Sequence, residues 1–424
     1  MRCGVEGDDG GASDQERSHD TGQQRGGGCG AAESHTTKGT GRRLTARLGA
    51  GSVGPGSVGA SSVGASSVGA GTVGPGSVAG MATSAGTLGS LGEAAVLARI
   101  FPRLPDAAAA LVGPGDDAAV LAAPDGRYVV TTDTMVHGPD FRLAWSTPAE
   151  LGWKAAATNL SDIAAMGARP TGLVVALVAP ADTPVETLEG IADGLREACA
   201  ELAPGCGVVG GDLSVSDTLV IAVTAFGDLE GRAPVLRSGA RPGDVVAVSG
   251  SLGLAAQGIA LLFAHAVDAD GHPDAALVPA LRRAHGAELA AQLTPRPPLT
   301  DGVLAALAGA TAMLDLSDGL ALDARRLAVA SGVSVDLDGV ALGIAGLALE
   351  GDREEVLGTE ALTGGEDHSL LATFPPGTGL PGDFRPIGRV RPAGDAGSEL
   401  LVDGTAFEAR GGWDPYADWN GKRG

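Results

Sequence analysis

Short apolar runs that alternate with longer segments of helical periodicity dominate the chain from residue 127 onward. The runs are nearly continuous in Val, Ile, Leu and Ala, which is typical of strands in a sheet that helices cover. In the helical segment 147–167, Thr147 can act as N-cap, Pro148 occupies the first helical position and Glu150 completes a capping box. The pattern predicts strands at 127–133, 171–180 and 218–229, a short strand and turn at 205–212, and helices at 92–101, 147–167 and 185–202.

A segment rich in Pro, Gly and Arg, EGRAPVLRSGARPGD (230–244), interrupts this alternation and predicts a domain boundary. Beyond it, a second unit begins at GDVVAVSG (243–250). We expect an α+β fold of two domains, residues 81–235 and 236–424, each a mixed β-sheet with helices on one side. The second domain is predicted to contain helices near 252–265, 274–293 and 319–331, and strands near 311–316, 333–338, 368–374 and 385–391.

Residues 1–80 differ from the rest of the chain because they are rich in Gly, Ser and Thr. Residues 51–80 divide into pentads such as GSVGA and SSVGA, each with at most one Val. Burying one Val per pentad cannot offset the conformational entropy that the chain loses on ordering. We therefore expect this segment to be disordered. Met81 stands just before the first helical pattern, so the segment is either a linker or a dispensable start that the natural chain lacks.

The charge balance limits the partners. A net charge of −22 disfavours nucleic acid and anionic membranes, and the three lysines are Lys38, Lys154 and Lys422. The four cysteines lack C-x-x-C spacing, which disfavours a zinc site or a disulfide scaffold. No run reaches the roughly eighteen apolar residues of a membrane span, and the first residues do not resemble a signal peptide. We therefore expect a cytoplasmic protein.

Aspartates flanked by Gly, Ser or Thr recur along the main body. Any single one is explained by a turn or a helix cap. Together, in a chain so poor in lysine, they predict a Mg²⁺-nucleotide site, because Mg²⁺ binds a few carboxylates along with water and phosphate oxygens. The residues, each expected at the end of a strand or helix, are Asp116, Asp117, Asp133, Asp162, Asp212, Asp315 and Asp318.

Familiar catalytic motifs are missing from the sequence. There is no G-x-x-x-x-G-K-S/T loop, no protein-kinase signature and no G-x-S-x-G elbow. Two glycine pairs, 210–211 and 364–365, are predicted at helix ends, where backbone N–H groups can approach phosphate. His137 and His368 lie near the acidic motifs, whereas His265, His272 and His285 are predicted on the surface.

The order of the motifs GDDAAVL, TTDTMV, GWKAAATNLSDIAAMGARP, GGDLS, RSGARPGD, LDLSDGLALD, TGGEDHSLL and GGWDPY resembles that of the thiamine-monophosphate kinases. The resemblance covers about residues 89–416 and extends to a superfamily that includes aminoimidazole ribonucleotide synthetase and selenophosphate synthetase. It implies transfer of the ATP γ-phosphoryl group to thiamine monophosphate, several Mg²⁺ ions, and a homodimer in which the N-terminal sheets pair. A phosphomonoester has its second pKa near 6, so such an acceptor needs no general base.

The resemblance also implies roles for individual residues. By position, the metal ligands are Asp117, Thr131, Thr132, Asp133, Asp162, Asp212, Asp315 and Asp318. Gly211, Arg237 and Ser317 correspond to ATP contacts, and Asp140, Glu366 and Trp413 to substrate contacts. Asp116 is not expected to bind the metal; it either caps the glycine turn or adjusts the charge of the acidic cluster from outside the metal ligands.

The chain departs from the family at two places. Asp140 stands where the family often has His before Phe, so a substrate-phosphate contact there falls to Asp140 or to His137. GGEDHSL replaces the usual GGEDYEL, which removes an acid and a tyrosine. Lys154 either extends from its helix to pair with one acid or balances the whole acidic cluster, and its being the main body's only lysine favours the second.

Three other functions remain as alternatives. A purine-precursor cyclo-ligase and a selenophosphate synthetase belong to the same superfamily. Selenophosphate synthetases usually have a reactive cysteine or selenocysteine in an N-terminal glycine-rich loop. Here the first cysteine of the main body, Cys199, lies on a predicted helix, which disfavours that activity. A non-catalytic nucleotide-binding protein is the third, and the intact Asp motifs disfavour it.

Overall fold

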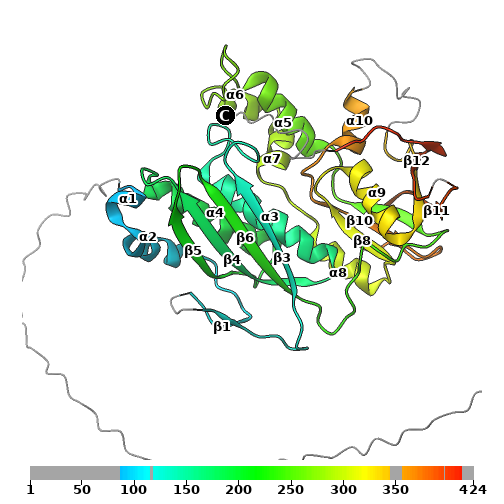
Figure 1. Cartoon of the computed structure of the whole chain (residues 1–424), viewed down its shortest axis with the longest axis horizontal. Coiled ribbons are helices and arrows are strands. Elements are labelled where there is room, and N and C mark those ends of the chain that lie inside the picture. Colours follow the sequence, from blue (N-terminus) through cyan, green and yellow to red (C-terminus); the bar gives the residue numbers. More distant parts are fainter. Residues whose placement is uncertain (1–85, 115–117, 344–355, 396, 413–424) are drawn as a thin grey trace, which may run out of the picture. The chain divides into compact units, whose positions relative to one another are not determined.

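The computed structural model describes residues 86–114, 118–343, 356–395 and 397–412 (Figure 1). The predictions for residues 1–80, Asp116, Asp117 and Trp413 lie outside these ranges. Residues Ala79–Gly424 form one compact unit whose described part has two main sheets and a separate pair of strands. The segment between the sheets, 229–244, contains no helix or strand, and the domain boundary placed there stays a prediction. Among the described residues, no helix is both long and apolar enough to cross a membrane.

The first sheet has four strands in the order β3-β6-β4-β5. Only β4 and β5 are parallel. Helices α3 and α4 cover one face of this sheet (Figure 1), and on β6 the residues Ile221, Val223 and Ala225 point into the core beneath them. The elements are β3 (Val129–Val136), α3 (Pro148–Ala165), β4 (Arg169–Ala179), α4 (Val185–Leu202), β5 (Val208–Val215) and β6 (Val220–Asp228).

Helix α3 begins as the sequence predicts. The Thr147 hydroxyl accepts the Glu150 N–H at 3.3 Å, and the Glu150 carboxylate accepts the Thr147 N–H at 2.8 Å. This reciprocal cap satisfies two N–H groups that the first turn leaves without a helical partner. The helix contacts β3, β4 and β6 of the first sheet and also β8 and β10 of the second, so it can carry side chains to both.

Elements before β3 pack along the first sheet. Ion pairs join Arg99 to Glu189 at 2.6 Å and Arg103 to Asp193 at 2.5 Å, which fasten α2 and the following 3₁₀ turn to α4. The predicted helix at 92–101 is confirmed as α2. The elements are α1 (Leu88–Leu91), α2 (Glu93–Ile100), the turn η1 (Phe101–Arg103), and a two-stranded sheet of β1 (Ala110–Val112) and β2 (Val120–Leu121).

The second sheet has seven strands in the order β13-β12-β9-β11-β7-β10-β8. Its helices are α5 (Leu254–His265), α6 (Val278–Ala284), α7 (Gly286–Leu293), α8 (Leu299–Leu307), α9 (Leu320–Ser331) and α10 (Val356–Thr363). Its strands are β7 (Val245–Ser249), β8 (Ala312–Leu316), β9 (Val333–Leu337), β10 (Ser369–Phe374), β11 (Arg385–Pro392), β12 (Leu400–Val402) and β13 (Thr405–Ala406).

Two predictions for this half are wrong. Helices cover both faces of the sheet rather than one: Val246 of β7 packs in the core beneath α9, whereas the next residue, Ala247, packs in the core that Ala305 of α8 enters. The helix expected at 274–293 is two helices, because His285 leaves helical geometry at φ −134° and ψ 49°. The α+β class is confirmed, while α8, α10, β12 and β13 were not anticipated.

Candidate phosphoryl-transfer site

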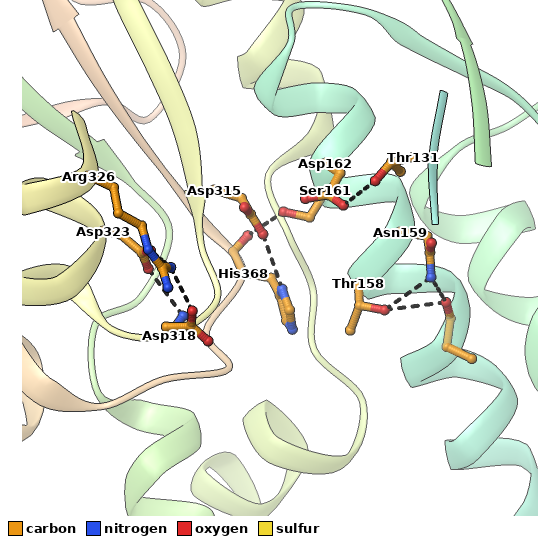
Figure 2. A network of polar contacts seen from close by, with 11 residues as sticks. Thr131, Thr158, Asn159, Ser161, Asp162, Asp315, Asp318, Asp323, Arg326 and His368 are labelled. Atoms are coloured by element: carbon orange, nitrogen blue, oxygen red, sulfur yellow. Dashed lines mark hydrogen bonds and ion pairs between the residues drawn. The ribbon is translucent and has the colours of Figure 1, made fainter. Parts of the chain in front are cut away.

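Three carboxylates from different elements meet between the two sheets. Asp133 lies on β3, Asp162 on α3 and Asp315 on β8. The Thr131 hydroxyl donates to Asp162 Oδ2 at 2.7 Å, and the Asp133 N–H donates to Asn159 Oδ1 at 3.1 Å. Figure 2 shows Asp162 and Asp315 facing each other across the gap between α3 and β8. The site is therefore assembled from both halves of the main body.

Burial and the neighbouring carboxylates raise the pKa values of two of these acids. Burial, followed by the nearby Asp315 carboxylate, raises the pKa of Asp162 to about 7. Asp133 reaches solvent, but protein atoms crowd its carboxylate, and this desolvation together with Asp315 raises its pKa too. Like charges held this close are destabilising without a cation. Carboxylate and hydroxyl oxygens are the donors that Mg²⁺ prefers, so the residues present fit a magnesium site.

His368 lies beside this cluster, although we assigned it no role from the sequence. Its side chain is buried, and Nδ1 is 3.4 Å from Asp315 Oδ2 (Figure 2). Burial alone would lower the pKa of His368, but the Asp315 carboxylate outweighs it and the pKa is raised. The Ser161 hydroxyl donates to the His368 carbonyl at 3.1 Å, which joins α3 to the start of β10. The one sequence signal was the histidine in GGEDHSL.

Asp318 is paired with an arginine that the sequence reasoning missed. Arg326 Nη1 lies 2.6 Å from Asp318 Oδ2 and 2.7 Å from Asp323 Oδ1 (Figure 2). Asp323 also accepts the Asp318 N–H at 3.1 Å, and burial raises its pKa to about 6. The available signal was the i, i+3 spacing of Asp323 and Arg326 on one helix.

Three glycine-containing loops meet at this end of the second sheet. The Glu366 N–H donates to the Ser317 carbonyl at 2.7 Å, so the GGED loop runs against the SDG loop. A side chain at Gly365 would place its Cβ 2.8 Å from the same carbonyl. At Gly412, with φ +79°, a Cβ would lie 2.3 Å from the Asp318 carbonyl. Glycine is thus required at both positions, and Gly412 directly precedes Trp413 in the sequence.

Charged and polar side chains gather around Glu366. Lys154 Nζ lies 2.5 Å from Glu366 Oε2, and Gln292 Nε2 donates to the same oxygen at 2.5 Å. Lys154 therefore pairs with one acid, Glu366. This is the first of the two roles considered from the sequence, the other being to balance the charge of the whole acidic cluster. Asp140 accepts the Val136 N–H at 2.7 Å, and burial followed by Glu366 raises its pKa. The ring centroid of His137 is 5.6 Å from that of Phe141.

Other predicted site residues lie apart from the acids. Side chains alternate along a strand, so Thr132 points away from Asp133, and its hydroxyl donates to the Val223 carbonyl at 2.9 Å. Asp212 is in register with Ala176 and Ala222, which also places it on the face opposite Asp133. The Arg237 carbonyl accepts the Ser331 hydroxyl at 3.1 Å, at the end of α9 far from Asp318.

Two statements about local placement are corrected. Asp133 and Asp212 lie inside strands β3 and β5, not at element ends. Gly210 and Gly211 also lie inside β5 rather than at a helix terminus. A Cβ at Gly211 would be 2.1 Å from the Val175 carbonyl, so strand packing requires this glycine, whereas the space at Gly210 is open.

A mostly apolar cavity of about 620 Å³ lies along β5. Its wall is formed by side chains of α2, α4 and β4, and by the described residues on either side of the GDD motif, Pro114 and Ala118. Gly210, Gly211 and Asp212 belong to the same lining. The cavity is large enough for a flat ring system, and two acidic residues, Glu93 and Asp212, belong to its lining.

Comparison with known proteins gives the class first. Residues 115–229 match the family described as AIR synthase related protein, N-terminal domain. The thiamine-monophosphate kinase of Mycobacterium tuberculosis is 45% identical over 343 residues, which are 80% of this chain and 96% of that one. The crystal structure of the enzyme from Stenotrophomonas maltophilia superposes with a TM-score of 0.59 at 31% identity and covers 74% of this chain and 95% of that one.

A further structure, AaThiL complexed with AMPPCP and TMP, has a TM-score of 0.55 at 31% identity and covers 70% of this chain and 90% of that one. The fold and the acidic site thus define a member of the AIR synthase-related superfamily. Within it, the chain belongs to the thiamine-monophosphate kinase family, as its motifs predicted.

Proposed function

We propose that this protein transfers the γ-phosphoryl group of ATP to thiamine monophosphate, which yields thiamine diphosphate and ADP. The observation that carries the proposal is the meeting of Asp133, Asp162 and Asp315 beside the loop that holds Glu366. The proposal is supported by the solved structure of a relative complexed with AMPPCP and TMP. Both ligands carry negatively charged phosphate groups, and such a reaction depends on positioning and on charge neutralisation rather than on a covalent intermediate.

Asp133, Asp162 and Asp315 would hold Mg²⁺, with the Thr131 hydroxyl bound to Asp162 in support. When bound, Mg²⁺ neutralises phosphate charge and orients the transferred group. The roles of Asp117, Thr132, Asp212, Asp318, Gly211, Arg237, Ser317 and Trp413 remain as the resemblance implies. For Asp318 to bind Mg²⁺, Arg326 would have to release its carboxylate or share it with the metal ion.

The protein's own groups prepare the two substrates. The cavity along β5 would accept the adenine ring, because its walls are apolar and Gly210 leaves open space beside them. The Glu366 carboxylate would face the cationic thiazolium. Deprotonation of the acceptor requires no side chain, since a phosphomonoester is largely dianionic at neutral pH.

We also propose a cytoplasmic homodimer. The face of the first sheet opposite α3 and α4 supports it, since Val130 on this face is 55% exposed and its β6 neighbour Phe226 is only half-buried. A second copy would remove these side chains from water. Sedimentation analysis of wild type and Val130→Asp tests the dimer, and an unchanged mass of the variant would contradict this interface.

The test of the function is a coupled ADP-release assay with ATP, Mg²⁺ and thiamine monophosphate, with the thiamine diphosphate product identified by mass spectrometry. A purine precursor and selenide serve as competing acceptors for the two sister activities. Turnover only with thiamine monophosphate supports the proposal. Turnover only with the purine precursor or with selenide, or ATP binding without any turnover, would overturn it.

A further inference from the structure

Lys154 occupies an unusual position for a lysine. It lies in the second turn of α3, its side chain is only 7% exposed, and it is the one lysine within the part of the chain that the structure describes. Burying an ammonium group is costly unless an anion compensates it. In the ligand-free protein the compensation comes from Glu366, which is contributed by the loop before β10.

The Glu366 side chain is fixed but not enclosed. One oxygen, Oε2, receives both Lys154 Nζ and the amide of Gln292, a residue of α7 that is only 4% exposed. The backbone of Glu366 has φ +67°, a conformation that a non-glycine residue adopts only when its surroundings impose it. The side chain nevertheless keeps 38% of its surface exposed. It is therefore held in one orientation and open to a ligand.

Asp140 completes the local charge pattern. Glu366 and Lys154 both act on the pKa of its carboxyl, which places the three groups within electrostatic reach of one another. Lys154 also acts on the pKa of His368, the neighbour of Asp315. Lys154 thus pairs with the predicted substrate contact Glu366 and lies within electrostatic reach of the histidine beside Asp315. In this region a donor phosphate and an acceptor phosphate have to meet.

We infer that Lys154 is the residue that binds the phosphate of thiamine monophosphate, and that the Lys154–Glu366 pair recognises this substrate as a zwitterion. The inference rests on the proposed function. Thiamine monophosphate carries a permanent thiazolium cation and a phosphate dianion, separated by a two-carbon linker. The ion pair presents the opposite charges side by side. The lysine has three N–H donors and gives one to Glu366, which leaves two for phosphate oxygens.

The ion pair also accounts for selection against unphosphorylated thiamine. Thiamine has the cation but no anion, so it can satisfy Glu366 but not the remaining donors of Lys154. Buried donors left without partners disfavour the analogue that lacks the matching group. Lys154 is therefore expected to set the preference for the phosphorylated substrate, whereas Glu366 acts on both compounds.

Isothermal titration calorimetry with AMPPCP and Mg²⁺ present tests this on the full chain. We expect wild type to bind thiamine monophosphate more tightly than thiamine. Lys154→Met should weaken thiamine monophosphate binding about 10- to 100-fold, the range for losing a charge-assisted hydrogen bond, and leave thiamine binding within about threefold. Glu366→Gln should weaken both ligands by similar factors. AMPPCP affinity serves as the control for an intact nucleotide site.

Lys154→Met leaves Glu366 without its cation, so a second variant guards against misfolding. The double variant Lys154→Met/Glu366→Gln removes both charges and should fold while losing the same preference. If wild type binds no thiamine monophosphate, the proposed function fails. If wild type binds it and both Lys154→Met and the double variant retain the wild-type ratio of the two affinities, the role of Lys154 is refuted while the function stands.

Discussion

At the scale of single residues, the site is a balance between acids and the cations that face them. The sequence predicted Asp133, Asp162 and Asp315 because each sits in a motif with small neighbours. It missed Arg326, Asp323 and the partner of Lys154, because these contacts depend on helix geometry and on loops that are far apart in the chain. The charge of the acids is readable from sequence, whereas the identity of the residue that neutralises each one is not.

We predict that Asp162→Asn stabilises the metal-free protein at pH 8. The pKa of Asp162 is raised to about 7, so the folded protein holds a proton there that the unfolded chain releases near pH 4. The contribution of Asp162 to stability is therefore greatest below pH 4 and falls as the pH rises from about 4 to about 7. Asp162→Asn removes this loss and should gain about 2 kcal/mol of stability at pH 8, and roughly a third of that gain at pH 5.

Thermal melts with and without Mg²⁺ measure this effect. Wild type should gain stability from Mg²⁺ at pH 8 and progressively less at lower pH, since protons compete for Asp162. Asp162→Asn should lose most of this response and most kinase activity. A variant that melts like wild type and still responds to Mg²⁺ would remove Asp162 from the metal site.

We predict that Arg326→Met destabilises the protein in a pH-dependent manner. At pH 8 the buried Asp323 carboxylate loses its cation, which we expect to cost about 1–3 kcal/mol. At pH 5 the cost should be smaller, because Asp323, with a pKa raised to about 6, is then mostly protonated. Urea unfolding at the two pH values compares Arg326→Met with Arg326→Lys, which keeps the charge. Equal costs at both pH values would contradict the pairing.

At the scale of elements, the sequence predicted helices and strands well wherever periodicity was strong. Helix α4 has the predicted bounds 185–202, and α3 begins at the predicted cap. Short elements such as β12 and β13 were missed because two or three residues carry no periodic signal. The placement of Thr132 on the opposite face to Asp133 follows from the alternation of side chains along β3, whereas the resemblance assigns both residues to the metal site.

Close packing of α3 on α4 gives a prediction at this scale. A Cβ at Gly152 would lie 2.0 Å from the Ile191 carbonyl, a backbone atom that cannot move without shifting α4. Gly152→Ala should therefore cost about 2–3 kcal/mol despite its gain in helix propensity. Gly286→Ala, in α7 with no atom within 4 Å of the added Cβ, is the matched control and should be neutral or slightly stabilising. Chemical denaturation of both variants makes the comparison, and equal stabilities would show that the two helices separate freely.

At the scale of the whole molecule, the described contacts that build the site all lie between residues 86 and 412. We therefore predict that a chain of residues 81–424 keeps the kcat, the KM for both substrates and the melting temperature of the full chain. Side-by-side kinetics and calorimetry test this. A loss of more than about threefold in kcat/KM, a change of about 0.7 kcal/mol, would assign a function to residues 1–80.

Helix α3 has a consequence for the reaction as a whole. It carries Lys154 and Asp162, which are eight residues apart and therefore about 12 Å apart along its axis. Because the helix between these two residues is rigid, its length sets how far the acceptor phosphate lies from the metal-binding acids. Inserting one residue between the two would rotate one group by about 100° relative to the other. We therefore expect the length of this interval to tolerate no change, even where the residues within it can be exchanged.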